Sequence, residues 1–303
     1  MSESANLPMV FGGISEPQFS DFEQSEILVL PVSYEGTVSY GAGTGKGAAA
    51  IIDASRNLEL YDEETDTEVY KLGIHTLENF APRETPEQMM SELYKYSADL
   101  LKTHKFLCTI GGEHSISAPI IQAHSEKFHN LSILQIDAHA DLRDEYDGTK
   151  HSHASVMARV VKDLRIPSVQ VGIRSISAEE IRSLTSGLPT KIFWAKDIVR
   201  NSEWIEPAVN CLTENVYLTI DIDGLDPSLI PTTGTPEPGG LDWYEVLELI
   251  KSVAEKKRIV GMDLVEFSHV EGQNAPAFLC AKLIYKTLSY IFQDDLPKVI
   301  GKL

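Results

Sequence analysis

Short apolar runs recur along the chain and are separated by more polar stretches. They lie near residues 27–33, 69–74, 106–110, 131–136, 168–173, 190–194, 216–222 and 259–265. Most of these runs are continuously apolar and do not alternate with polar residues, which is typical of strands that are covered on both faces. The pattern therefore predicts about eight strands buried inside the protein.

Helical patterns fill many of the gaps between these runs. The clearest examples run from Pro86 to His104, Ser115 to Phe128, Ala154 to Leu164, Asp242 to Lys256 and Ala275 to Phe292. Strands that alternate with helices predict the α/β class, with a mostly parallel sheet between two layers of helices. Because no linker-like break interrupts the pattern, we expect one domain over residues 1–303, with residues 1–26 as an N-terminal extension.

Composition narrows the range of partners. The 303 residues carry a formal net charge of −19, which disfavours nucleic acid and anionic membranes and is compatible with a small cationic substrate. The cysteines Cys108, Cys211 and Cys280 follow no Cys-x-x-Cys pattern, so we expect reduced thiols. We find neither a signal-like start nor a run of roughly 18 apolar residues. We therefore expect a cytoplasmic protein.

Two acidic strings follow two of the predicted strands. One reads Asp-Ala-His-Ala-Asp at 137–141, and the other reads Asp-Ile-Asp at 221–223. In extended backbone, side chains two residues apart point to the same face. Four carboxylates and an imidazole would then converge, and without cations the carboxylates would repel one another and lose their solvation. We therefore interpret the two strings as a two-metal hydrolytic site.

Structural roles compete with this interpretation. Asp137 could cap a helix, His139 could be a hydrogen-bonded core residue, Asp141 could form a turn, and Asp223 could start a turn with the glycine that follows it. These roles do not explain why the polar residues share one face. Asp226, which precedes a proline, we assign to a turn.

A third polar string, Gly-Gly-Glu-His-Ser at 111–115, follows the apolar run 106–110. Because ligands of open parallel sheets bind beyond the carboxyl ends of the strands, we expect His114 in the same crevice. The competing role for His114 is that of an ordinary hydrogen-bonded histidine at a helix start. Glu113 we assign to an outer or turn role, and Ser115 to the N-cap of the following helix.

The expected ligands are carboxylates and imidazoles, with no thiolate. This set suits Mn²⁺ and, less well, Zn²⁺, Ni²⁺, Co²⁺ or Fe²⁺. Two such ions about 3.5–4 Å apart lower the pKa of a water held between them and so create a nucleophile for an electrophilic carbon or phosphorus.

Taken together, these strings resemble the ureohydrolases, the family of the arginases and agmatinases. The resemblance spans roughly residues 27 to 292, the motifs occur in the family's order, and an arginase-like three-layer α/β/α fold is implied. The matching strings are Gly-Gly-Glu-His-Ser at 111–115, Asp-Ala-His-Ala-Asp at 137–141, Ser-His-Ala-Ser at 152–155, Asp-Ile-Asp-Gly-Leu-Asp-Pro at 221–227, Gly-Thr-Pro-Glu-Pro-Gly-Gly at 234–240 and Asp-Leu-Val-Glu at 263–266.

The resemblance also implies how two Mn²⁺ ions per subunit would be bound, with two bridging aspartates. The ligands of one ion would be His114, Asp137, Asp141 and Asp221. Those of the other would be Asp137, His139, Asp221 and Asp223. In this family, a hydroxide held between the metals attacks a guanidinium carbon and urea leaves.

Three catalytic roles follow from the same resemblance. Asp141 would orient the hydroxide, Glu266 would pair with the substrate guanidinium, and His153 would shuttle protons. His151 competes with His153 for the last role, and Glu266 could instead be a satisfied acid after its strand. The family more often has Asp at position 113, and glycine at position 154.

The segment 142–148 bears on the substrate, because it does not resemble the loop that binds the α-carboxylate and α-amine in arginases. It is more similar to the agmatinase branch. Asp144, Glu145 and Asp147 would suit the ammonium of agmatine, or they form a solvated loop face. Arg143 would favour a carboxylate-bearing substrate such as 4-guanidinobutyrate if it points into the crevice, and otherwise forms a surface salt bridge.

We therefore expect an agmatinase that releases urea and putrescine. The alternatives are a ureohydrolase acting on guanidinobutyrate, arginine or a related guanidino acid, and a catalytically silent metal-binding subunit on the same scaffold. The resemblance further implies a homo-oligomer, either a trimer or a hexamer.

Overall fold

The computed structural model describes residues 9–201 and 203–301. The strands are β1 (Ile27–Pro31), β2 (Ile74–Thr76), β3 (Phe106–Ile110), β4 (Leu131–Ile136), β5 (Ser168–Ile173), β6 (Thr190–Trp194), β7 (Asn215–Asp221) and β8 (Arg258–Val265). They form one sheet in the order β2-β1-β3-β8-β7-β4-β5-β6, in which every pairing is parallel. The predicted α/β sheet of about eight strands is confirmed.

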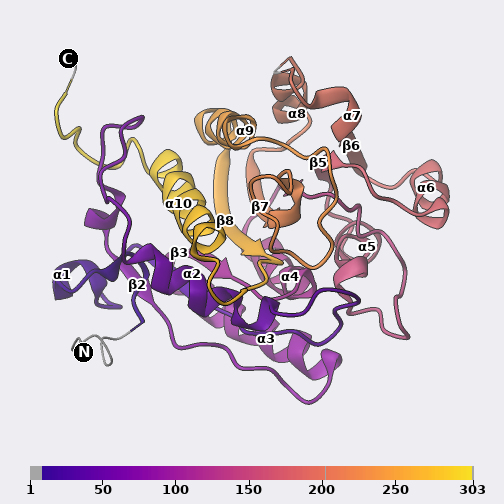
Figure 1. Ribbon diagram of the computed structural model, residues 1–303, viewed down its shortest axis with the longest axis horizontal. Helices are drawn as coiled ribbons and strands as arrows, with labels where there is room; N and C mark the ends of the chain where they lie inside the picture. The colour runs from indigo at the N-terminus through magenta and orange to yellow at the C-terminus, as the bar shows by residue number, and fades with distance from the viewer. Residues whose placement is uncertain (1–8, 202, 302–303) are drawn as a thin grey trace.

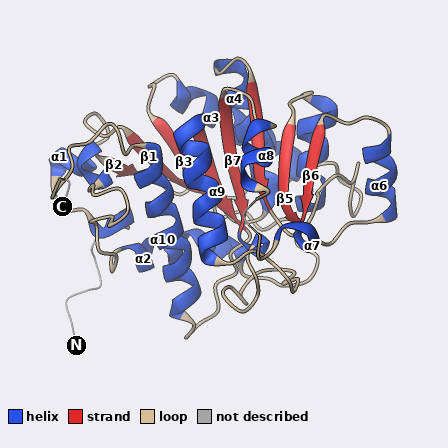
Figure 2. Ribbon diagram, turned by 90° about the horizontal axis from the view of Figure 1, so that it is seen from above, coloured by secondary structure: helices blue, strands red, loops and turns tan. Residues whose placement is uncertain are grey.

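Helices cover both faces of this sheet (Figure 1 and Figure 2). The helices are α1 (Pro17–Ser20), α2 (Gly47–Ser55), α3 (Pro86–Leu101), α4 (Ser117–Lys127), α5 (Val156–Ala158), α6 (Ala178–Thr185), α7 (Ala195–Ile198), α8 (Ile205–Asn210), α9 (Trp243–Lys256) and α10 (Asn274–Ile291). One buried cluster joins the sheet to α2, α8, α9 and α10, and a second joins it to α3, α4 and α5. The three-layer arrangement is therefore as expected.

The strands supply apolar side chains to both clusters in turn. On β1, Ile27 and Val29 belong to one cluster, and Leu28 and Leu30 belong to the other. Because each strand is buried on both faces, its sequence is continuously apolar. This burial explains why the runs do not alternate with polar residues.

Two predicted elements differ in the structure. Residues 69–72 form a 3₁₀ turn and not a strand, because Gly73 adopts a φ of 81° and donates its amide to the Tyr70 carbonyl, so that β2 begins only at Ile74. The helix expected over 154–164 is broken into a 3₁₀ turn at 153–155, the short α5 and a π-helical turn at 159–163. Of the N-terminal extension, residues 1–8 lie outside the described residues, while Phe11 packs in the core.

The four central strands, β3, β8, β7 and β4, are the ones that carry the polar strings. Since all strands are parallel, their carboxyl ends meet at one edge of the sheet, where residues 111–115, 137–141, 221–223 and 263–266 come together. The fold therefore gathers motifs that are up to about 150 residues apart in sequence.

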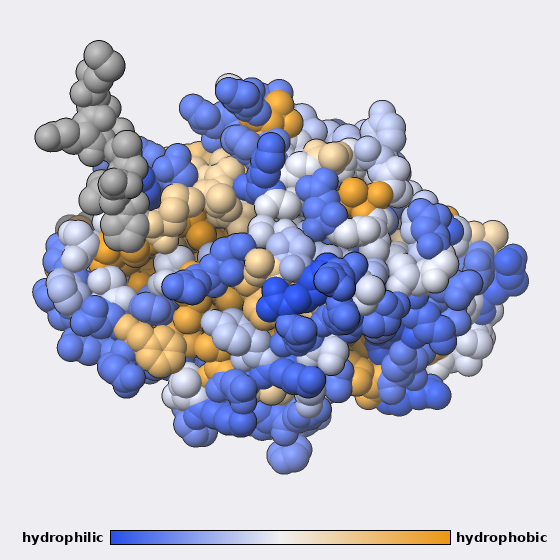
Figure 3. Space-filling model, turned by 90° about the horizontal axis from the view of Figure 1, so that it is seen from below, coloured by the Kyte–Doolittle hydropathy of each residue, from blue (hydrophilic) through white to orange (hydrophobic). Residues whose placement is uncertain are grey.

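One face of the molecule combines hydrophilic and hydrophobic areas. Hydrophilic residues cover most of the face drawn in Figure 3, and hydrophobic residues gather in patches, mainly in the left half of that view. Among the described residues, no helix combines the length and the apolar character needed to cross a membrane.

Candidate metal centre and active site

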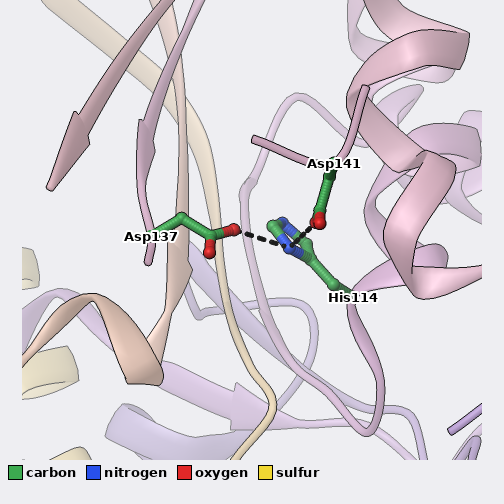
Figure 4. A group of neighbouring side chains, drawn as sticks. All are labelled: His114, Asp137 and Asp141. Carbon is green, nitrogen blue, oxygen red and sulfur yellow. Dashed lines mark ion pairs between the residues drawn. The ribbon is translucent and has the colours of Figure 1, made fainter. Parts of the chain in front are cut away.

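The first group of side chains surrounds His114, which lies just before α4. Its Nδ1 atom is 3.2 Å from Asp137 Oδ2, 3.0 Å from Asp141 Oδ2 and 3.4 Å from Asp221 Oδ2. Figure 4 shows His114 between Asp137 and Asp141, with their carboxylates turned toward the ring. All four side chains are buried. Three strand ends thus supply one compact set of nitrogen and oxygen ligands.

The second group surrounds His139 and shares Asp137 with the first. His139 Nδ1 lies 3.0 Å from Asp223 Oδ2 and 3.6 Å from Asp137 Oδ1. In each of two sets of three residues, one potential ligand atom per residue lies within 4.8 Å of the others, and the sets are His114, Asp137 and Asp141, and Asp137, His139 and Asp223. The structure therefore brings all six sequence-predicted ligands together, with Asp137 between the two groups.

One hydrogen bond joins the two acidic strings, and another lies within the first string. The amide of Ala138 donates to Asp223 Oδ1, and the amide of His139 donates to Asp137 Oδ1. Gly224 fits only because it has no side chain, since a Cβ there would lie 2.7 Å from the backbone nitrogen of Asp137. This close approach of two strand ends brings the string at 137–141 close to the string at 221–223.

Burial makes it costly for the acids of this cluster to ionise. Burial first, and then neighbouring acids, raise the pKa of Asp141 to about 7 and hold that of Asp221 well above its usual value. Although burial opposes it, Asp223 and Asp137 raise the pKa of His139 to about 12. Acids that resist ionisation beside imidazoles that hold protons indicate a site that favours added cations.

The donor set fits divalent ions. His114 Nδ1 is buried and has three carboxylate oxygens close by, yet none of them meets the geometry of a hydrogen bond. An imidazole nitrogen that faces carboxylates in this way could bind a cation together with them. Carboxylates and imidazoles without thiolates suit Mn²⁺ and its neighbours in the transition series.

Glu266 follows β8 directly and reaches the same cavity. Its Oε1 atom accepts the backbone amide of His114 at 2.6 Å, and burial followed by the charge of Glu113 raises its pKa to about 8. Both Glu266 and Asp141 adopt left-handed backbone, with φ of 63° and 53°. Such conformations cost about 1 kcal/mol or more outside glycine, and here they fall on two residues expected to be catalytic.

The two competing histidines, His153 and His151, lie in different places. His153 lines the cavity that contains the acidic cluster, and its Nδ1 atom is 3.3 Å from the Thr37 hydroxyl. Burial lowers the pKa of His153 to about 4, so its ring is neutral near pH 7. His151 instead lines a separate depression beside Tyr94 and Arg159.

The cavity has a volume of about 330 Å³, and polar, charged and apolar residues line it. Arg143 lines it, with its guanidinium carbon 5.1 Å from the centre of the Tyr146 ring. Asp144, Glu145 and Asp147 do not line it, and Asp144 pairs with Arg159 at 2.9 Å. Those three acids therefore belong to a solvated loop face, which was the alternative to ammonium binding.

Glu113 and Ser115 take structural positions. Glu113 accepts the amides of Gly36 and Thr37 at 2.7 and 2.6 Å, so it ties the loop after β1 to the site. The N-cap expected at Ser115 is wrong, because its hydroxyl donates to Glu113 Oε1 instead of capping α4. Asp226, as expected, shapes a turn by accepting the amides of Ser228, Gly239 and Gly240.

Residue-by-residue reading of the sequence missed several side chains of the cavity wall. Glu237 lines the mouth, and its backbone carbonyl accepts two hydrogen bonds from Arg174, which also binds the carbonyls of Asp223 and Leu225. Glu237 lies inside the string 234–240, so the motif contained it without indicating its role. Tyr40, which lines the cavity, and Thr37, which contacts His153, come from a loop with no recognisable signal.

Comparison with known proteins agrees with this geometry. The model of the Arginase family matches residues 25–289, so the chain belongs to the arginase family. It is 38% identical to an N(1)-aminopropylagmatine ureohydrolase of Synechocystis sp., over 92% of this chain and 94% of the relative. It is 31% identical to an agmatinase of Pyrococcus horikoshii, over 88% of this chain and 92% of the relative. The predicted resemblance to the ureohydrolases is confirmed.

A solved structure shows the same fold. The crystal structure of agmatine ureohydrolase of Thermoplasma volcanium matches with a TM-score of 0.85 at 27% identity, and the match covers 96% of each chain.

Proposed function

We propose that the protein is a two-metal ureohydrolase that cleaves agmatine to putrescine and urea. The observation that carries the proposal is the pair of histidine–aspartate groups that share Asp137 at the carboxyl edge of the sheet. Water adds to the guanidinium carbon, the bond from that carbon to the alkyl-substituted nitrogen breaks, and the amine leaves with a proton.

Two divalent cations, here proposed to be Mn²⁺, would supply an activated water at neutral pH and neutralise the acids around it. His114, Asp137, Asp141 and Asp221 would hold one of them. Asp137, His139, Asp221 and Asp223 would hold the other. Asp141 would also orient the attacking water, since its carboxylate lies beside His114 at the base of the cavity.

Glu266 and His153 would act on the substrate. The Glu266 carboxylate lines the cavity and would pair with the planar guanidinium. Thr37 donates its hydroxyl proton to Glu113, so the Thr37 oxygen accepts the proton carried by His153 Nδ1. The lone pair of the neutral His153 ring is then on Nε2. His153 Nε2 could then take a proton and pass it to the departing amine.

The mouth of the cavity favours a cationic tail. Glu180 lines it too, but its carboxylate already accepts the amides of Leu142 and Ser177. Among the described residues, the Glu237 carboxylate has only the weak contact with His139 Nε2 at 3.9 Å, so it is available for an ammonium group. Arg143 also lines the cavity and would repel that ammonium, so its placement favours the alternative substrate 4-guanidinobutyrate. Its contacts with the Tyr146 ring and with Glu180, 4.0 Å from its Nε, offset part of its charge.

A second substrate is favoured by the comparisons. The Synechocystis relative, at 38% identity, is named for N(1)-aminopropylagmatine, whereas the Pyrococcus agmatinase is 31% identical. That substrate is agmatine lengthened by an aminopropyl group, and the same reaction would release the corresponding triamine. Its second cation would extend toward the exposed rim that includes Tyr40.

The test is urea release with added Mn²⁺ from agmatine, N(1)-aminopropylagmatine, 4-guanidinobutyrate, 3-guanidinopropionate and arginine. We expect one of the two amines to have a kcat/KM at least about 100-fold above that of any acid, or about 3 kcal/mol. A preference for 4-guanidinobutyrate or arginine would overturn the proposed substrate. Absence of urea from every compound, with two Mn²⁺ bound, would favour the silent metal-binding subunit. Assembly into a trimer or hexamer stays a prediction.

A further inference from the structure

A chain of buried polar groups lies behind His114, on the side away from the acidic cluster. His114 Nε2 is 2.9 Å from the Thr219 hydroxyl oxygen, and that hydroxyl donates to Asp263 Oδ1 at 2.6 Å. Tyr217 donates its hydroxyl to the other oxygen, Oδ2, at 2.8 Å. Each of these four side chains is at most 1% exposed. We call Thr219, Asp263 and Tyr217 the buried relay.

The sheet register puts the relay in place. Thr219 on β7 and Asp263 on β8 are direct partners in the ladder, and Tyr217 lies two residues earlier on β7, so it points to the same face. Asp221 follows Thr219 by two residues on that face. A single polar row on two adjacent strands therefore leads from the core to a proposed metal ligand.

Stability alone does not account for Asp263. Burial raises its pKa, and in the described part of the chain neither lysine nor arginine forms an ion pair with it. A buried carboxylate bound only by hydroxyl groups costs more free energy than apolar residues of the same size. The neighbouring core positions on β7 and β8, such as Leu218 and Leu264, are apolar.

The donors and acceptors fix the state of the imidazole. Thr219 has one hydroxyl proton and gives it to Asp263, so its oxygen must accept the proton carried by His114 Nε2. In the neutral ring the lone pair is then on Nδ1, which is the atom that faces Asp137, Asp141 and Asp221. This is the tautomer that binds a cation through Nδ1.

We propose that Thr219 and Asp263 are positioning residues that hold His114 in the tautomer and orientation needed to bind a metal ion, and so set the affinity of that ion. The inference rests on the metal site proposed above. Tyr217 steadies the far end of Asp263 but does not contact the imidazole, so it provides a control within the same relay.

The experiment compares Thr219→Val with Thr219→Ser and Tyr217→Phe. Valine keeps the shape of threonine and its preference for strands but removes the hydroxyl, whereas serine keeps the hydroxyl. Each protein is stripped of metal with a chelator, and Mn²⁺ binding is measured by isothermal titration calorimetry. Thermal melting of the metal-free proteins shows whether each variant is folded.

We expect Thr219→Val to weaken one of two Mn²⁺ binding events about 10- to 100-fold and to leave the other within about 3-fold. Thr219→Ser should restore the lost affinity, and Tyr217→Phe should bind both ions nearly as the parent protein does. Asp263→Asn should weaken the same event as Thr219→Val.

Two results would overturn the inference while leaving the metal site intact. One is unchanged binding of two ions by Thr219→Val; the other is an equal loss in Thr219→Val and Tyr217→Phe, which would indicate a general packing effect. If Thr219→Val does not fold, the decision falls to Asp263→Asn: unchanged binding of both ions by that variant would refute the relay. A parent protein that binds no Mn²⁺ would instead refute the proposed function.

Discussion

The two imidazoles of the proposed metal centre are held in different surroundings. His114 is 1% exposed, and its Nε2 atom contacts the buried relay, which extends into the core. The His139 side chain is 25% exposed, and its outer nitrogen faces Glu237 at 3.9 Å across the cavity mouth. One side of the centre is therefore built into the sheet, and the other faces the space where a substrate would enter.

This difference separates two tasks. The orientation of a buried imidazole is fixed before any ion binds when its second nitrogen is hydrogen-bonded. This lowers the free-energy cost of ordering the metal site. The exposed side is bordered by loops, namely residues 38–41 and 234–237, whose side chains can vary without disturbing the sheet. We infer that the inner side serves metal binding and that the outer side also serves substrate choice.

The largest effect should come from Asp137→Asn, because Asp137 belongs to both histidine–aspartate groups. Replacing its carboxylate removes an anionic ligand from both groups at once. Mn²⁺ content, measured by elemental analysis after dialysis, should fall at both sites, and kcat/KM should fall by roughly 10³-fold, which is about 4 kcal/mol.

The matched control is Asp144→Asn, which removes a carboxylate from the neighbouring loop without touching the cluster. That variant should keep two ions and near-normal turnover. If Asp137→Asn lost only one ion, the two sides would be less connected than the geometry indicates. Unchanged urea release would refute the bridging role.

Sequence patterns predicted the proposed ligands on both sides better than the residues that surround them. The ligands at 137–141 and 221–223 could be recognised because short spacing after buried strands fixes both their order and their face. The parallel order of β3, β8, β7 and β4 then brings these strings together, but that order depends on long-range packing that no local pattern contains.

Thr219 and Glu237 show why other residues were missed. Thr219 sits in an apolar strand, where a threonine normally signals only strand propensity. Its role depends on its partner in β8, 44 residues away. Glu237 depends on a loop held by Arg174, so its position reflects tertiary hydrogen bonds and not its neighbours in sequence.

A second, smaller effect is expected from Glu266→Gln. Glutamine keeps an oxygen that can accept the His114 amide but removes the charge that would face the guanidinium. We expect kcat/KM for agmatine to fall roughly 10²-fold, about 3 kcal/mol, while two Mn²⁺ ions remain bound.

Steady-state kinetics and elemental analysis of the same preparation test this directly. The result would sharpen the contrast between the two sides, since it would remove substrate recognition without touching a ligand. Loss of an ion with normal turnover would instead place Glu266 among the ligands.

The smallest effect, and the one that can break the comparison, is expected from Glu237→Gln. Because this side chain is partly exposed, losing its pairing with the ammonium should cost about 1 kcal/mol, seen as a roughly 5-fold rise in KM for agmatine with kcat little changed. The rise should be absent for 4-guanidinobutyrate, and Glu179→Gln, on the exposed part of α6, should behave like the parent protein.

Mn²⁺ titration of Glu237→Gln decides between two roles of this side chain. Unchanged affinity would keep Glu237 as a substrate contact, whereas a 10-fold loss would mean that it holds His139 as the relay holds His114, and the two sides of the centre would then be alike.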